Sequence, residues 1–430
     1  MSSRRVLGAR ALRMTLWAVL SAWGLFNAGM ARAQGAKGEN YPVEPGTSTS
    51  VRFAGQLRLL YTTLTPERFF GIRTPSGEDV RRNPNVGRND GFVLNRARLN
   101  MRATLRDDIA VRLGFEGAAV RYEDLNSPIG QLGTMLTDAY AHFHLDAVGD
   151  LFAGRFRPPW DIESLTPPDA QLFVQRALES VGVAPQEGYS GDMAGFSVNR
   201  QLGLMMSNDA AFWLNNTFFG YAVALTNGAN AGSGDANLND NDLPALFLRA
   251  TWGYNGASRD PGDEQGPATY GVQEGGLIGL GVLVDEQTFG NAPNRFRSRV
   301  VGLGLDAAFT FNILTLQGQL LVLRREHLLL ADSRTERGIG GHAQIAALIP
   351  HTNLRLGYRF AVLNPRWVPG DNQTSDTADY DRVMHHTIGI RYTPAQLPVV
   401  FWADFTSSLE QQGRVTANDR VQLAMQASFE

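Results

Sequence analysis

Arginine recurs at alternate or near-alternate positions in several short stretches of the amino-terminal third of the chain. These stretches supply Arg58, Arg96, Arg98, Arg102, Arg112, Arg155 and Arg157. A guanidinium group is permanently charged, and its planar fork of donors suits carboxylate and phosphate oxygens. Arginines gathered on one surface therefore predict electrostatic attraction and hydrogen bonding of anions. The alternative interpretation is that acids such as Glu116 and Asp138 pair with these arginines, which would then be structural.

A group of acids follows the last of these arginines. It consists of Asp161, Glu163 and Asp169, in a segment interrupted by Pro158-Pro159 and Pro167-Pro168. If this segment folds inward, its carboxylates could face the arginines across a constriction and orient a charged solute between them. If it stays outside, the same carboxylates are solvated loop residues, and the sequence leaves both readings open.

The other candidate ligands and nucleophiles carry weaker signals. His142 and His144 share one face of a predicted strand and could bind a metal, but such a pair more often lines water. Residues 235–242 are rich in oxygen ligands, yet they lack the glycine and final glutamate of a calcium-binding loop. The chain has no cysteine, no G-x-S-x-G turn and no H-E-x-x-H helix. We therefore expect no enzyme, no metal and no cofactor.

The elements that would position these residues are amphipathic β-strands. Within residues 91–122, Leu99 and Met101 alternate with Arg98 and Arg102, and the pattern resumes after a short polar turn. Successive side chains of a strand point to opposite faces, so one face is apolar and the other basic. A soluble sandwich would bury the apolar face, whereas a transmembrane barrel turns it to lipid and keeps the polar face in a wet lumen.

The same alternation recurs through the rest of the chain. Strands are expected near residues 50–63, 91–122 (as a hairpin), 135–146, 151–157, 198–207, 211–226, 244–254, 276–286, 297–310, 313–326, 338–349, 352–363, 384–393, 398–407 and 419–429, with a turn at Asn208-Asp209 between the sixth and seventh. Short turns alternate with long loops, which is typical of outer-membrane barrels. We thus predict an all-β transmembrane antiparallel β-barrel of about 16 strands with long outer loops.

Two segments do not follow the pattern. Residues 158–195 show no lasting alternation, and a long loop of this kind tends to be functional. Residues 254–275 are too long for the periplasmic side on which a barrel of this topology places them.

Composition and the amino terminus indicate export. The 430-residue chain has 19% charged residues, below the roughly 25% usual in soluble domains. Residues 1–33 combine a basic start, an apolar stretch at 16–26 and the cleavage pattern Ala31-Arg32-Ala33, as in a secretory signal peptide. They hold five arginines and no acid, so their removal takes the net charge from -3 to -8, which argues against a nucleic-acid binder. A linker at 34–49 and a barrel domain at 50–430 would follow.

The last predicted strand, 419–429, ends on the penultimate residue Phe429. An amphipathic terminal strand with an aromatic residue near its end is similar to the signal that the barrel-assembly machinery reads. Together with the signal peptide, it favours the outer membrane of a Gram-negative bacterium.

Four short stretches resemble one family. Residues 92–99 (FVLNRARL) are similar to its F-x-x-R-R-A-R-L strand, with Asn95 in place of the first arginine. The other stretches are Asp138-Ala139-Tyr140, residues 154–159 (GRFRPP) and residues 225–228 (LTNG). All four resemble motifs of the phosphate-selective porins of types O and P, in the same order.

This resemblance implies a 16-stranded homotrimeric channel in outer-membrane lipid, with a third loop folded into the lumen. The expected function is passive diffusion of small hydrophilic solutes, filtered by size at that loop and biased toward anions or phosphate by the arginines named above. A closed structural or adhesin-type barrel without transport is the alternative.

Overall fold

In the computed structural model, the residues from Ser48 onward belong to one compact unit, Ser48–Glu430. The structure describes residues 49–65, 91–117, 135–145, 148–167, 170–183, 193–214, 216–228, 243–254, 275–289, 296–327, 335–365, 382–395, 397–410 and 419–429. The predicted signal peptide, the linker up to Ser48 and residues 255–274 lie outside these ranges.

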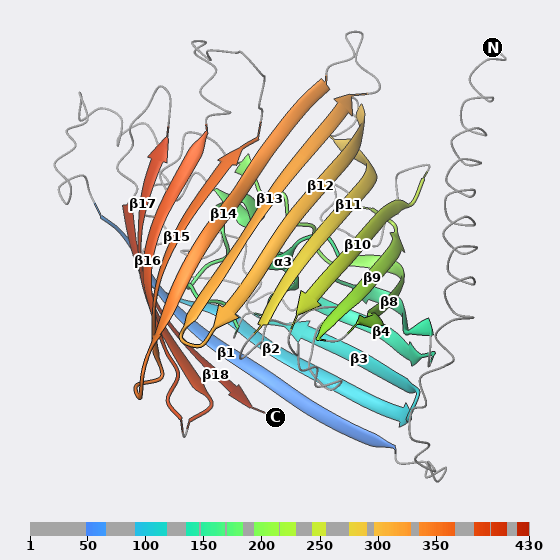
Figure 1. The fold of residues 1–430 in the computed structure, drawn as a ribbon, viewed down its shortest axis with the longest axis horizontal. Coiled ribbons are helices and arrows are strands. Elements are labelled where there is room, and N and C mark those ends of the chain that lie inside the picture. Colours follow the sequence, from blue (N-terminus) through green and yellow to red (C-terminus); the bar gives the residue numbers. More distant parts are fainter. Residues whose placement is uncertain are drawn as a thin grey trace. The chain divides into compact units, whose positions relative to one another are not determined.

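Sixteen of the described strands close into an antiparallel barrel in which β1 pairs with β18 (Figure 1). Along the ring they are β1 (Ser50–Thr65), β2 (Gly91–Arg106), β3 (Ile109–Glu116), β4 (Met135–His144), β5 (Asp150–Phe156), β8 (Gln201–Leu214), β9 (Thr217–Thr226), β10 (Ala245–Tyr254), β11 (Gly275–Phe289), β12 (Phe296–Phe311), β13 (Leu314–His327), β14 (Thr335–Ile349), β15 (Leu354–Asn364), β16 (Val383–Tyr392), β17 (Val399–Glu410) and β18 (Asp419–Phe429). The predicted all-β antiparallel barrel is confirmed.

Side chains alternate between the two faces of the wall. On β12, Val301, Leu303 and Leu305 are exposed, whereas Val300 and Asp306 are buried. The same arrangement places exposed leucine, valine and phenylalanine side chains on one side of most strands. An apolar surface of this extent is suited to lipid, with the polar alternate positions facing the lumen.

The turn predicted at Asn208-Asp209 is wrong. Asn208 lies within β8 and pairs with Tyr221, and the pairing register shifts between Asn208 and Phe212. The strand continues to Leu214, and β9 begins at Thr217. A β-bulge lets a strand absorb polar residues that would otherwise mark a turn, which is why local composition misplaced this boundary.

The seam of the barrel joins the two ends of the sequence. Phe429 on β18 pairs with Gly55 on β1. A Cβ atom at Gly55 would lie 2.0 Å from Cζ of Phe429, so the aromatic ring lies directly across the glycine. This contact is on the outer face, where Phe53, Leu57 and Phe429 are all exposed.

Among the described residues, no helix is long and apolar enough to cross a membrane.

Candidate functional site: an arginine wall and an inner segment

The chain between β5 and β8, residues 157–200, is called the inner segment here. Its described parts contain α3 (Ile162–Leu165), α4 (Leu178–Val181) and a two-stranded sheet of β6 (Gly182–Val183) and β7 (Met193–Ala194). Asp161 caps α3 by accepting a hydrogen bond from the Ser164 backbone N–H at 2.8 Å. Most described residues of this segment are buried, and the partners that bury them belong to the inner face of the barrel. The predicted infolded third loop is therefore confirmed.

Trp160 is the main apolar anchor of the inner segment. It is fully buried in a cluster with Phe247, Leu283 and Leu321 of β10, β11 and β13. A Cβ atom at Gly302 would lie 2.5 Å from Cη2 of the indole, so this glycine leaves the recess that the ring fills. The indole Nε1 donates to the Phe196 carbonyl at 3.0 Å, which satisfies the polar atom of a buried tryptophan.

Further apolar contacts fix the segment to other strands. Leu178 and Val183 pack on Ala361, Leu363 and Val383 of β15 and β16. Elsewhere, Val174 packs on Leu60, Val400, Trp402 and Ala424 at the barrel seam, and Phe173 packs on Ala346 of β14. The buried wall members of these clusters lie on β5 and on the strands from β8 round to β1. None of them lies on β2, β3 or β4, and β2 and β3 carry several arginines.

Polar contacts reinforce the attachment near the seam. The Val174 N–H donates to Asp404 Oδ2 at 2.5 Å, and Arg58 donates to the Val174 carbonyl. Arg359 donates to the Gln175 carbonyl at 3.0 Å. Backbone groups that would otherwise be unpaired inside the barrel are therefore satisfied by wall side chains.

A buried cluster of ionisable groups attaches α4 to the wall. His342 Nδ1 lies 2.6 Å from Glu179 Oε1, and His342 Nε2 lies 3.7 Å from Glu163 Oε1. Gln319 Nε2 also donates to Glu179 Oε1, at 2.7 Å. These side chains are almost fully buried, so their mutual contacts replace the water they lose.

The predicted acids of the inner segment lie as follows. Asp161 is fully buried and accepts hydrogen bonds from the Ser197 hydroxyl at 3.1 Å on both oxygens. Burial raises the pKa of Asp161, although these hydrogen bonds oppose the shift. Glu163 is buried beside His342, and Asp169 lies outside the described residues. The two described carboxylates therefore hold the segment together and attach it to β14.

The arginine wall is defined here as Arg58, Arg96, Arg98, Arg102 and Arg112, on β1 to β3. Their register pairs Arg58 with Arg96, and Arg102 with Arg112. Paired residues share a face, and Arg58, Arg98 and Arg112 are buried on the inner one. Glu116 Oε2 lies 3.2 Å from Arg98 Nη2 and 3.6 Å from Arg96 Nε. One carboxylate is thus shared between two guanidinium groups, and the wall keeps a positive excess.

Arg155 does not join this wall. It pairs with Ala139 on one side and with exposed Leu202 on the other, so it lies on the outer face of β5. The alternate positions Phe152 and Phe156 face inward. The alternation within residues 151–157 predicts the opposite assignment, with Phe152 and Phe156 facing lipid and Arg155 and Arg157 facing the lumen. They turn inward because the anchor cluster around Trp160 provides an apolar surface inside the barrel.

Three further cations come from the inner segment, and only Arg157 was singled out from the sequence. Arg157 donates to the Ser164 carbonyl, and Arg176 Nη2 donates to the Thr166 carbonyl at 3.2 Å. Arg200 Nε lies 2.6 Å from Asp138 Oδ1. Burial, with the neighbouring cations Arg176 and Arg200, lowers the pKa of Arg157. Arg176 and Arg200 stand in a stretch without strand alternation, so their sequence context gave no indication of their place.

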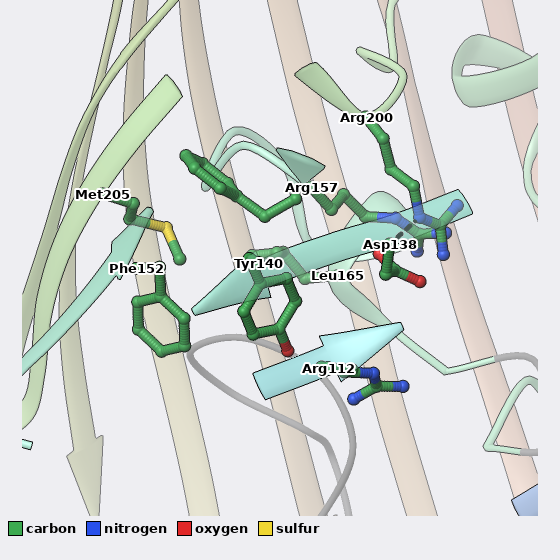
Figure 2. A pocket seen from close by; sticks show the side chains of 9 residues that line it. Arg112, Asp138, Tyr140, Phe152, Arg157, Leu165, Arg200 and Met205 are labelled. Carbon is green, nitrogen blue, oxygen red and sulfur yellow. Dashed lines mark hydrogen bonds and ion pairs between the residues drawn. The ribbon is translucent and has the colours of Figure 1, made fainter. Parts of the chain in front are cut away.

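A pocket lies between this cation group and the wall (Figure 2). Its lining includes Arg112, Asp138, Arg157 and Arg200 on one side, and Phe152, Phe156, Leu165 and Met205 with Tyr140 on the other. Figure 2 shows the ends of Arg157 and Arg200 beside the Asp138 carboxylate, and the Tyr140 hydroxyl directed toward Arg112. The pocket thus combines donors of positive charge with an apolar surface.

The two histidines of β4 have an acidic partner. Asp150 Oδ1 lies 2.7 Å from His142 Nε2 and 3.0 Å from His144 Nδ1. Within the described part of the chain, no group of three or more ligand side chains is arranged to hold a metal ion.

The fold and the site define a class: a 16-stranded antiparallel β-barrel with a segment folded into a lumen that carries several arginines. The model of the phosphate-selective porin O and P family matches residues 77–253, which confirms the family resemblance seen in the sequence. These residues include all four motif stretches, β2 to β9, the inner segment and all of β10 except Tyr254. Over these residues the chain is similar to a family of porins.

Solved outer-membrane channels share the fold at low sequence identity. The channel DcaP of Acinetobacter baumannii is 15% identical, with a TM-score of 0.52, and the match covers 89% of this chain and 97% of that one. An anion-selective porin from Comamonas acidovorans is 12% identical, with a TM-score of 0.52 and coverage of 89% and 100%. OmpF of Salmonella typhi is 13% identical, with a TM-score of 0.51 and coverage of 89% and 98%. No curated protein matches the sequence.

Proposed function

We propose that the protein is a diffusion porin of the outer membrane that passes small hydrophilic solutes and prefers anions, with phosphate among them. The observation that supports this preference is the excess of guanidinium groups where the inner segment meets β1 to β4. Arg96 and Arg98 share one carboxylate, Glu116. The cations of the inner segment meet Asp138 through Arg200. Fixed positive charge in a narrow lumen raises the local concentration of anions and selects for them.

The route for solutes runs along the arginine wall. The buried wall residues of the apolar clusters lie on β5 and on the strands from β8 round to β1, so we place the remaining lumen beside β2 to β4. The same packing of the inner segment is the observation that favours the alternative, a closed structural barrel. Single-channel conductance in a planar bilayer distinguishes a porin from a closed barrel. A porin gives discrete conducting steps, whereas a closed barrel gives none.

Reversal potential in a salt gradient tests the preference. We expect the wild type to favour chloride over potassium, and Arg98→Gln to lower the permeability ratio roughly two- to fivefold, because about 0.5–1 kcal/mol of local electrostatic energy is removed. The effect should shrink at high salt, where charges are screened. Arg324→Gln is the matched control, because Arg324 is exposed and already paired with Glu326. A cation-selective wild type would contradict the proposal.

The remaining parts of the proposal concern export and assembly. Residues 1–33 would be cleaved as a signal peptide, the barrel-assembly machinery would recognise the strand ending at Phe429, and the mature barrel would form a homotrimer in outer-membrane lipid. Amino-terminal sequencing and the mass of the purified complex in detergent test cleavage and trimer formation.

A further inference from the structure

We propose that His142, His144 and Asp150 form a group of variable charge at one end of the lumen, and that this group makes the anion preference of the channel rise as the pH falls. The inference rests on the proposed function, because it requires ions to pass beside β2 to β4. It goes further by naming residues that determine selectivity besides the arginine wall, and by making that selectivity depend on pH.

The two histidines lie on the inner face of β4. Tyr140 lines the pocket inside the barrel and pairs with the inward residue Arg112. His142 and His144 follow Tyr140 at alternate positions of the same strand, so all three side chains point to one side of the wall. The histidines adjoin the turn between β4 and β5, at the opposite end of β5 from the inner segment. Short turns of this kind mark the periplasmic end of an outer-membrane barrel.

Both imidazoles converge on one carboxylate oxygen. Asp150 Oδ1 lies 2.7 Å from His142 Nε2 and 3.0 Å from His144 Nδ1. Asp150 pairs with His144 across the hairpin of β4 and β5. The His142 ring also stacks on Phe152, with centroids 4.7 Å apart. The hairpin and the stacked ring thus hold the three side chains together.

All three side chains are accessible to water. The exposed fractions are 23% for His142, 52% for His144 and 33% for Asp150. Histidine side chains change charge between about pH 5 and 8. The group carries a single negative charge when both imidazoles are neutral and a single positive charge when both are protonated. The sign of its charge therefore reverses across the neutral range of pH.

The other charged residues near this group respond differently to pH. Among the described residues they are Arg102 of β2, Arg112 of β3, and Arg106, Asp107 and Asp108 where these two strands join. The His144 N–H donates to the Asp108 carbonyl at 2.8 Å, and the Asp108 carboxylate is paired with Arg106. On the other side of β5, the uncharged Ser207 of β8 lies opposite Asp150. Arginine stays protonated and an exposed aspartate stays ionised over the range in which histidine changes charge.

The charge of this group adds to the fixed charge of the arginine wall, or subtracts from it. At high pH the negative group opposes the entry of anions at this end of the lumen. At low pH the positive group acts together with the wall arginines. Charges about 10 Å apart are only partly screened at physiological salt, so the reversal changes the local concentrations of anions and cations beside the solute route.

Reversal potentials in a potassium chloride gradient across a planar bilayer test this inference. The chloride-to-potassium permeability ratio of the wild type should rise roughly two- to fivefold between about pH 8 and about pH 5.5. The rise should be smaller in concentrated salt, where the charges are screened. A double variant with His142→Gln and His144→Gln should keep a nearly constant ratio over the same range.

Single variants separate the effect of charge from that of structure. Asp150→Asn removes the shared carboxylate and leaves both imidazoles, so the rise should persist while the ratio is higher at every pH. His144→Gln changes the more exposed imidazole and should give an intermediate rise, even if the double variant fails to assemble. His386→Gln is the matched control, because His386 contacts the exposed Tyr358 on the outer face, and it should show the full rise.

The outcomes distinguish this inference from the proposed function. A wild-type permeability ratio that stays constant with pH overturns the inference alone, and so does a full rise in the double variant. If the double variant does not assemble, a full rise in His144→Gln has the same meaning. A wild type that does not conduct, or that is cation-selective at every pH, overturns the proposed function itself.

Discussion

At the scale of single residues, Glu116 is the acid whose negative charge offsets part of the positive charge of the arginine wall. Its Oε2 lies within 3.6 Å of both Arg96 and Arg98, while its Oε1 accepts the Ala97 N–H at 2.8 Å. The carboxylate therefore positions the two side chains and also cancels part of their charge. Its removal should have the opposite effect on selectivity to the removal of an arginine.

We expect Glu116→Gln to raise the anion preference, because the amide keeps the size of the side chain but removes the negative charge. The chloride-to-potassium permeability ratio should increase roughly two- to fivefold, from a local change of about 0.5–1 kcal/mol. Reversal potential in a salt gradient measures it. Glu326→Gln, at an exposed pair with Arg324, should change nothing; an unchanged ratio in Glu116→Gln would show that these arginines do not act on permeating ions.

At the scale of elements, the inner segment depends on buried polar contacts as well as on its apolar anchors. Glu179 accepts a hydrogen bond from Gln319 and contacts His342, all inside the barrel. Removing its carboxylate leaves buried partners unsatisfied, which costs roughly 1–3 kcal/mol.

Glu179→Ala should therefore loosen α4 from β14 and make the open-channel current noisier, with a higher mean conductance. Single-channel recording at fixed voltage tests this expectation. Gln317→Ala provides the control, because Gln317 lies two residues from Gln319 on the same strand and outside this cluster. Identical current noise in Glu179→Ala and wild type would mean that the apolar anchors alone hold the segment.

Most of the barrel could be predicted from the sequence, because strand alternation is a local signal. The period of two at Leu99, Met101, Arg98 and Arg102 is readable without any partner strand. The two faces of β5 could not be assigned in this way. Phe152 faces inward because Trp160, from a segment without periodicity, supplies the apolar partner. Such an exception depends on tertiary contacts, which local alternation does not encode.

The residues of the candidate site also differ in how far the sequence predicts their position. The wall arginines were accessible to sequence reasoning because they occupy regular strand positions. Arg176 and Arg200 were not, because their positions follow from how the inner segment crosses the lumen. The partner of Asp138 is Arg200, 62 residues away in the sequence, and no spacing rule connects them.

At the scale of the whole molecule, closure of the barrel depends on the seam between β1 and β18. The Phe429 ring lies across Gly55, where any Cβ would meet it at 2.0 Å. Gly55→Leu should displace the ring and cost roughly 1–3 kcal/mol through overpacking.

Refolding into detergent micelles, followed by heat-modifiable mobility on gels, measures this effect. We expect a lower folded fraction for Gly55→Leu, and recovery when Phe429→Ala makes room in the same chain. Leu57→Ala, a neighbouring outward position, should fold normally. A normal folded fraction for Gly55→Leu would show that the ring moves aside without cost.

The contacts that attach the inner segment also bear on the order of barrel closure and docking of that segment. Val174 and Gln175 are bound by Asp404 and Arg359, on strands that are synthesised and inserted much later than the segment itself. Its docking surface is complete only after β17 stands next to β18 and β1. If docking follows closure, we expect the newly closed barrel to be wider until the segment settles. During that interval the protein would form a wider pore, and the rate of docking would determine how much solute crosses the membrane through it.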